Sequence, residues 1–317
     1  MRRNINAFIP VFIMLVVAIV CGIMYMFFTN KLPKHQNDNK IANMQSENDI
    51  ILSKNELPRL DAAANLQPLM TSVVRDFTQD GSISDGFFNY SNTDSAYRKL
   101  INGEADIIFA PYPSDDILTM ASAKGIEFDI IPIVKEGLVF FVNNDNQVSS
   151  LSIDDIRQIY TGQVSNWSQL DGENIDIKAF QKTYNSITQN AMISLVMGEL
   201  QILEPEKRVF YDKNLGEIND VIANYDNSKN AIGYSFYYDA KNIYDIDERI
   251  DNSVRLLEID GIVPSYDTIH DESYPLKLNY YLVKNKSNNY ENVQIFVNAL
   301  TSDRGKKVVK EAGYIDN

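Results

Sequence analysis

The segment that most constrains this chain is an uncharged apolar run over residues 7–28. At a rise of 1.5 Å per residue, a helix over this run is roughly 33 Å long, which matches the hydrocarbon core of a bilayer at about 30 Å. Arg2 and Arg3 precede the run and favour a cytoplasmic N-terminus, although Lys31 and Lys34 beyond it weaken that signal. We therefore expect one membrane-spanning helix over residues 1–28, with the remaining chain on the extracytoplasmic side.

The same run has two other interpretations. A cleaved secretory signal has a shorter apolar region and small residues at its cleavage site, whereas this run ends in the bulky sequence MYMFF. A lipoprotein signal has small residues directly before its cysteine, whereas Ile19 and Val20 precede Cys21. An uncleaved anchor is favoured, and cleavage and lipidation stay open as alternatives.

Residues 29–55 are polar and show no hydrophobic period, so we interpret them as a flexible tether with a reach on the order of 30 Å. The rest of the 317-residue chain is long enough to form about two domains. The formal net charge of -14 disfavours a nucleic-acid partner. A compact anion is still a possible ligand, because amide and hydroxyl donors act at short range while net charge is screened over roughly 10 Å.

Catalytic and metal-binding patterns are missing from the sequence. There is one cysteine, Cys21, and there are two histidines, His35 and His270. One cysteine excludes an intrachain disulfide, and we find no P-loop, no Gly-x-Ser-x-Gly and no His-Glu-x-x-His motif. We therefore expect a protein that is not an enzyme and that holds no cofactor or metal.

Short apolar runs alternate with helical patterns after the tether. Residues 105–109 and 138–142 have the composition of buried strands, and residues 153–160 and 295–309 have the spacing of amphipathic helices. This alternation predicts an α/β fold with a mostly parallel sheet.

Residues 151–167 read LSIDDIRQIYTGQVSNW, a pattern that resembles the phosphate-type solute-binding proteins of ABC transporters. Further segments follow in that family's order, namely residues 185–189, 231–235, 259–264, 274–276 and 312–315. The resemblance spans about residues 56–315, and the common order of the segments carries it. Within the pattern we expect Trp167 to be a buried core residue.

The resemblance implies a two-lobed α/β fold of the type II periplasmic-binding-protein class, here with an N-terminal single transmembrane helix. We place lobe I at residues 56–134 and 266–317 and lobe II at residues 135–265. In this family phosphate lies between the lobes, held by backbone amides at helix N-termini, by hydroxyls, by an arginine and by a carboxylate. An N-terminal helical turn suits an anion because its N–H groups are unpaired and carry partial positive charge.

Transferring the family's ligands position by position gives a set of candidate ligand-binding residues. They are Ala63, Ala64, Asn65, Thr93, Lys182, Ser186 and Thr188.

Several of the family's features are missing from this set. The hydroxyls that follow the family's aspartate are replaced by alanines after Asp61, and Pro111 stands where the family has its carboxylate. Lys182 replaces an arginine and cannot grip an oxyanion with two parallel hydrogen bonds. Ile187 replaces a glycine, and its β-branched side chain opposes close approach of the backbone to a ligand.

Two functions compete on these observations. The first is an anchored solute-binding protein, monomeric, that captures phosphate or another small oxyanion and delivers it to an ABC permease. The second is a cell-surface sensor or interaction module that keeps the fold and has lost phosphate binding. In the second case the candidate residues are ordinary cap and surface residues.

Overall fold

The computed structural model describes residues 52–53, 55–78, 88–182, 186–203, 208–209, 228–246 and 254–317. Contacts divide the chain into residues 1–49 and residues 50–317, and the fold described below is that of the second unit. The predicted membrane helix and nearly all of the predicted tether lie outside the described residues. Within the described ranges, no helix has both the length and the apolar character needed to cross a membrane.

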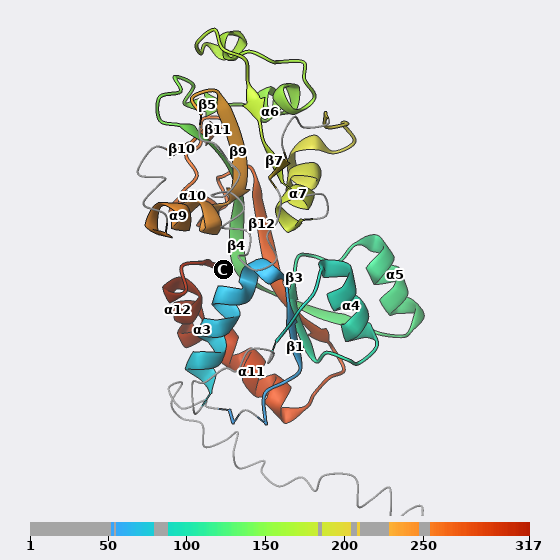
Figure 1. Ribbon diagram of the computed structural model, residues 1–317. Helices are drawn as coiled ribbons and strands as arrows, with labels where there is room; N and C mark the ends of the chain where they lie inside the picture. Colours follow the sequence, from blue (N-terminus) through green and yellow to red (C-terminus); the bar gives the residue numbers. More distant parts are fainter. Residues whose placement is uncertain are drawn as a thin grey trace, which may run out of the picture. The chain divides into compact units, whose positions relative to one another are not determined.

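Nine strands of the described chain form one mixed sheet (Figure 1), in the order β2-β1-β3-β12-β4-β9-β6, with β10 and β13 also paired to β4. Their bounds are β1 (Leu60–Ala62), β2 (Asn89–Tyr90), β3 (Ile107–Ala110), β4 (Phe128–Asn143), β6 (Lys178–Ala179), β9 (Ala231–Phe236), β10 (Val254–Leu256), β12 (Lys277–Asn285) and β13 (Ile315–Asp316). Two small sheets pair β5 (Ser150–Leu151) with β11 (Glu258–Ile259), and β7 (Gln181–Lys182) with β8 (Arg208–Val209).

The long strands β4 and β12 connect the two halves of the fold (Figure 1). They pair antiparallel from Lys277 opposite Gly137 to Asn285 opposite Phe128, with a register shift between Tyr280 and Tyr281. The prediction of a mostly parallel sheet was wrong, because β4 and β12 are antiparallel to each other and to the strands β9 and β3 beside them. Parallel pairing is confined in this sheet to β1 with β2, β1 with β3, and β6 with β9.

Helices cover both faces of the strands, and several of them begin at a capping side chain. Their bounds are η2 (Ala64–Leu66), α3 (Gln67–Phe77), α4 (Thr93–Ile101), α5 (Asp115–Ala123), α6 (Ile153–Tyr160), η3 (Trp167–Leu170), α7 (Ile187–Met192), η4 (Ile193–Met197), α9 (Tyr237–Ile246), α10 (Tyr266–His270), α11 (Glu291–Thr301) and α12 (Asp303–Glu311). Helix α6 matches the predicted helix at residues 153–160, and a capping box between Ser152 and Asp155 explains its start.

The predicted helix over residues 295–309 is two helices. Ser302 has an extended backbone with ψ of 168° and ends α11, and its Oγ accepts a hydrogen bond from Gly305 N at the start of α12. An N-cap serine normally has a non-helical backbone, as Ser302 does here. The apolar spacing therefore continues from α11 into α12, although the helical backbone is interrupted at Ser302.

Side-chain alternation along β3 separates two core clusters. Ile107 and Phe109 pack in a first cluster with buried residues of α3, α11 and α12. Ile108 and Ala110 face the other way and pack in a smaller cluster with residues of α4 and α5. Successive strand residues point to opposite faces, so one short strand supports helices on both sides.

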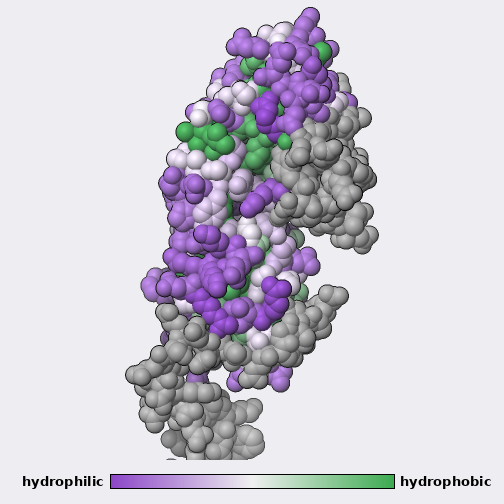
Figure 2. Space-filling view, turned by 90° about the vertical axis from the view of Figure 1, so that its left-hand side faces the viewer, coloured by the Kyte–Doolittle hydropathy of each residue, from purple (hydrophilic) through white to green (hydrophobic). Residues whose placement is uncertain are grey.

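A further cluster, called here the second cluster, fills the other half of the fold. Trp167 is only 1% exposed there, and its Nε1 donates a hydrogen bond to Asn230 O at 3.0 Å, which confirms the prediction that it is a core residue. Ile269, Tyr274 and Leu276 also pack in this cluster, although the predicted boundary assigns them to lobe I. On the face shown in Figure 2 the described residues are mostly hydrophilic.

Candidate anion-binding site

Residues 63–65 lie at the carboxyl edge of the parallel strands β1, β2 and β3. Ala62 pairs with Tyr90 and with Phe109, so the chain segments that follow these strands meet at one edge. The amide of Ala63 is already used there, because it donates to Phe109 O at 3.0 Å and the residue is buried. Of the predicted alanines, Ala64 is therefore the exposed one at this turn.

Asn65 is held firmly by two tyrosines. Its Nδ2 donates to the Tyr280 hydroxyl at 2.8 Å, and its backbone oxygen accepts from the Tyr314 hydroxyl at 2.6 Å. Burial raises the pKa of Tyr314, which keeps this hydroxyl protonated as a donor. The Oδ1 atom of Asn65 is buried and has no hydrogen-bond partner among the described residues. Ala64 and Asn65 begin η2, where N–H groups lack acceptors in a preceding turn.

Thr93 lies at the first turn of α4, close to the same edge. The preceding residue Asn92 caps the helix by accepting a hydrogen bond from Ser95 N at 2.9 Å. Thr93 itself is half-buried, and its hydroxyl makes no hydrogen bond with any described residue. The structure therefore brings the Thr93 hydroxyl and the η2 turn to one edge of the sheet.

A charged pair with a buried carboxylate, near this edge, was missed by the sequence reasoning. Asp61 is fully buried, and its Oδ2 accepts hydrogen bonds from Lys99 Nζ at 2.7 Å and from Ser91 Oγ at 2.9 Å. The Asp61 Oδ1 atom has no hydrogen-bond partner in the described chain. A charged residue within the short apolar strand β1, three positions before the η2 turn, was the signal available for finding it.

The second group of candidates surrounds β7 and α7. Lys182 is 4% exposed, and its backbone N donates to the Tyr234 hydroxyl at 3.2 Å. That hydroxyl in turn donates to Gln189 Oε1 on α7. Tyr234 therefore links the strand that carries Lys182 to the helix that follows, and residues 183–185 between them lie outside the described chain.

At the start of α7, Ser186 caps the helix and Thr188 is buried in the fold. Ser186 is the N-cap, and its Oγ accepts from Gln189 N at 3.1 Å. Thr188 is completely buried. Ile187 between them packs against both the first and the second cluster. Ile187 thus contributes to packing between the two halves.

A stacked tyrosine pair gives a second connection between the halves. Tyr238 on α9 and Tyr314 before β13 have ring centroids 3.9 Å apart and planes inclined by 9°. Glu136 on β4 accepts from its neighbour Gly137 N at 2.9 Å and from Tyr238 N at 3.3 Å. Because Tyr314 also bonds to Asn65, this pair connects α9 directly to the η2 turn.

Pro111, which the predicted correspondence places at the family's carboxylate, has its backbone oxygen occupied. The Tyr97 hydroxyl donates to Pro111 O at 2.8 Å, and burial raises the pKa of Tyr97. Proline has no side-chain acceptor, so a protonated oxyanion meets no carboxylate at this position.

These two lobes of helix-covered sheet, joined by long antiparallel strands, define the class of protein. The family model of the PBP superfamily domain matches residues 60–304, and the chain belongs to this family. Its fold is the two-lobed fold of periplasmic-binding proteins. The predicted resemblance to the phosphate-type solute-binding family of ABC transporters is confirmed.

Curated relatives and solved structures agree with this family. Phosphate-binding protein PstS of Staphylococcus haemolyticus is 27% identical over 80% of this chain and 79% of its own length. PstS of Staphylococcus saprophyticus is 24% identical over 80% of this chain and 78% of its own length. An ABC-type phosphate transport receptor from Vibrio cholerae has the same fold, with a TM-score of 0.64, 19% identity and coverage of 81% of this chain and 98% of its own.

Proposed function

We propose that this chain is a membrane-anchored extracytoplasmic solute-binding protein that captures phosphate or another small oxyanion and presents it to an ABC permease. The lobes at residues 56–134 with 266–317 and at residues 135–265 would close over the ion, in a protein that acts as a monomer. The observation that carries the proposal is the η2 turn, where Ala64 is exposed and Asn65 is fixed by Tyr280 and Tyr314. Amides at such a turn bind an anion without any cationic side chain.

The experiment is ligand-dependent stability of the full-length chain with phosphate, sulfate and other oxyanions. A ligand that binds only the folded state stabilises it by about 2.7 kcal/mol at a concentration of 100 times Kd, which raises the melting temperature. We expect phosphate to raise the melting temperature of the natural chain. The rise should be smaller in Lys182→Ala, and larger in Lys182→Arg because arginine restores a bidentate donor. An unchanged melting temperature with every oxyanion would contradict the proposal.

A second candidate function is a cell-surface sensor or interaction module that has lost the anion. It is favoured by Ile187, which packs against both clusters, and by Ser186, whose oxygen already caps α7. On this alternative, Lys182→Arg combined with Ile187→Gly would create phosphate binding that the natural chain lacks. Calorimetry with phosphate on the natural chain and on this double variant separates the two functions.

A further inference from the structure

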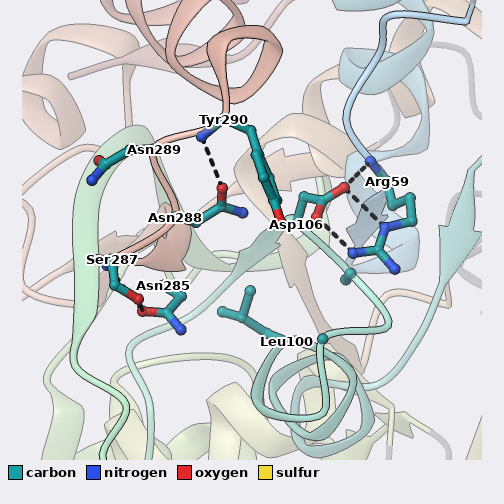
Figure 3. Close-up of a pocket in the computed structure, with 10 residues that line it drawn as sticks. Arg59, Leu100, Asp106, Asn285, Ser287, Asn288, Asn289 and Tyr290 are labelled. Carbon is teal, nitrogen blue, oxygen red and sulfur yellow. Dashed lines mark hydrogen bonds and ion pairs between the residues drawn. The ribbon is translucent and has the colours of Figure 1, made fainter. Parts of the chain in front are cut away.

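A pocket of about 550 Å³ lies on the first half of the fold (Figure 3). Arg59 directly precedes β1, Asp106 directly precedes β3, and Asn285 ends β12. These residues mark the amino edge of the parallel strands, whereas the η2 turn follows their carboxyl edge. The volume falls within the range of about 300–1,000 Å³ that is typical of small-molecule sites.

The charged residues of the pocket neutralise each other. Arg59 donates to Asp106 through its backbone N at 2.8 Å, its Nε at 3.0 Å and its Nη2 at 2.7 Å. The hydrogen bond with Asp106 raises the pKa of Arg59. Burial alone would raise the pKa of Asp106, but the hydrogen bonds and charge of Arg59 outweigh burial and lower it. The pair stays ionised and balanced, so it offers no unpaired charge to an ionic ligand.

The sequence beside the pocket also disfavours an anion. Glu104 and Glu291 are exposed and adjoin the pocket residues Ala105 and Tyr290. Neither carboxylate forms an ion pair with a described residue, so both repel an anionic ligand. Asp106 is already paired with Arg59 and is therefore not available to bind a cationic ligand. A neutral polar ligand fits these charges best.

Two amide donors, at the end of β12 and in the loop that follows it, have no hydrogen-bond acceptor among the described residues. The Oδ1 of Asn285 accepts from Ser287 N at 3.0 Å, and the Oδ1 of Asn288 accepts from Tyr290 N at 3.2 Å. These bonds orient both side chains, and neither Nδ2 group has an acceptor in the part of the chain that the structure describes. Two oriented NH₂ groups at the pocket are ready to donate to ligand oxygens.

An exposed aromatic ring completes the pocket. Tyr290 is 69% exposed, and its ring lies between Asn288 and the Arg59–Asp106 pair (Figure 3). Leu100, which is 3% exposed, lies at the base of the same view. A large exposed aromatic side chain beside oriented amides provides an apolar face next to hydrogen-bond donors.

We propose that this pocket binds a neutral saccharide. A pyranose ring has an apolar face of C–H groups that stacks on the Tyr290 ring, and its hydroxyls accept hydrogen bonds from the amides of Asn285 and Asn288. A nucleoside would also stack on Tyr290. A flat base, however, exposes two apolar faces, and Tyr290 is the one aromatic ring among the residues that line this pocket. The saccharide therefore matches the pocket better.

The test is calorimetry on the full-length chain in a detergent that has no sugar headgroup. Glucose, N-acetylglucosamine and the disaccharides cellobiose and maltose are titrated, with adenosine and uridine as the competing class. We expect at least one saccharide to bind. Tyr290→Ala should lower the affinity for that saccharide about tenfold, because the stacking face is lost. Asn288→Asp keeps the acceptor for Tyr290 N and removes the NH₂ donor, so it should also weaken binding by several-fold.

Tyr112→Ala is the matched control, because Tyr112 is another exposed tyrosine, at 59%, and does not line the pocket. It should leave saccharide binding unchanged, and phosphate binding should be unchanged in every pocket variant. The proposal is overturned if no saccharide binds, if Tyr290→Ala binds as the natural chain does, or if a nucleoside binds at Tyr290 more tightly than any saccharide.

Discussion

At the scale of single residues, several of the candidate ligand residues already make structural contacts within the fold. Ser186 Oγ caps α7, Thr188 is buried, and the Ala63 amide pairs with Phe109 O. What remains accessible is the turn at Ala64 and the half-buried Thr93. Oxyanion binding by this chain would therefore depend on backbone amides more than on side chains.

Ile187→Gly tests whether the packed isoleucine blocks the site. Removing its side chain from the contact with both clusters frees the α7 backbone to approach an anion, and one recovered hydrogen bond to a charged ligand is worth about 1.5–3 kcal/mol. We expect phosphate affinity to rise about ten- to hundredfold, measured by calorimetry. Ile187→Ala removes the packing but keeps a Cβ, so it should give a smaller gain. Equal affinity in all three proteins would rule out this role of Ile187.

The Arg59–Asp106 pair predicts a pH dependence of stability. Because the pKa of Asp106 is lowered in the folded state, its stabilisation is present above the unfolded value of about 3.9 and is lost as pH falls through the lower folded value. Asp106→Asn should thus reduce the free energy of unfolding at pH 7 by about 1 kcal/mol, since Arg59 is largely exposed. In urea unfolding, the difference in the free energy of unfolding between the natural chain and Asp106→Asn should be smaller near pH 3 than at pH 7. A difference that persists unchanged in acid would exclude the ionic contribution.

At the scale of elements, the break between α11 and α12 shows how one backbone turn overrides a continuous apolar pattern. Ser302 leaves the helical region, caps α12 and donates its own hydroxyl to Ala299 O at 2.7 Å. Gly305 then passes close to the end of α11, where a Cβ on this residue would lie 2.0 Å from Leu300 O. The two helices can turn at this point because position 305 has no side chain.

Gly305→Ala should therefore destabilise the protein, against ordinary helix propensity. Alanine is favoured over glycine in a helix by about 0.5–1 kcal/mol, but the clash with backbone cannot be relieved by a rotamer change. We expect a loss of about 1–3 kcal/mol in urea unfolding. Lys307→Ala on the exposed face of the same helix should change stability by less than about 0.5 kcal/mol. A more stable Gly305→Ala variant would contradict the close contact between position 305 and Leu300 O.

At the scale of the whole described fold, β4 and β12 carry the covalent connection, and side chains from both clusters add to it. Ile187 and Leu278 each pack against the first and the second cluster. The Tyr238–Tyr314 stack joins α9 to the η2 turn through the Asn65 hydrogen bond. The η2 turn and the arrangement of the two halves are thus physically connected.

Tyr238→Ala should weaken this connection. An aromatic pair contributes about 0.5–1.5 kcal/mol beyond the area it buries, so urea unfolding should show at least that loss. Tyr238→Phe keeps the stacked ring and serves as the control. Small-angle scattering should show a larger radius of gyration for Tyr238→Ala than for Tyr238→Phe. Identical scattering from the two variants would mean that the stack does not hold the halves together.

Local sequence determined those elements whose cause lies within a few residues. The 153–160 helix was predictable because Ser152 and Asp155 cap it and its apolar residues repeat at helical spacing. The burial of Trp167 and the family fold were likewise predictable from ordered local motifs. The mixed parallel and antiparallel pairing of the sheet could not be predicted in this way, because it depends on which distant strands pair with β4 and β12.

Only the tertiary structure decided which side chains meet. Asp61 and Lys99 are 38 positions apart and Arg59 and Asp106 are 47 apart, and no local pattern pairs them. The same is true of the tyrosines that hold Asn65 and of the two clusters that Ile187 contacts. Side-chain pairing across such distances follows from the three-dimensional path of the strands, which brings distant segments of the chain side by side.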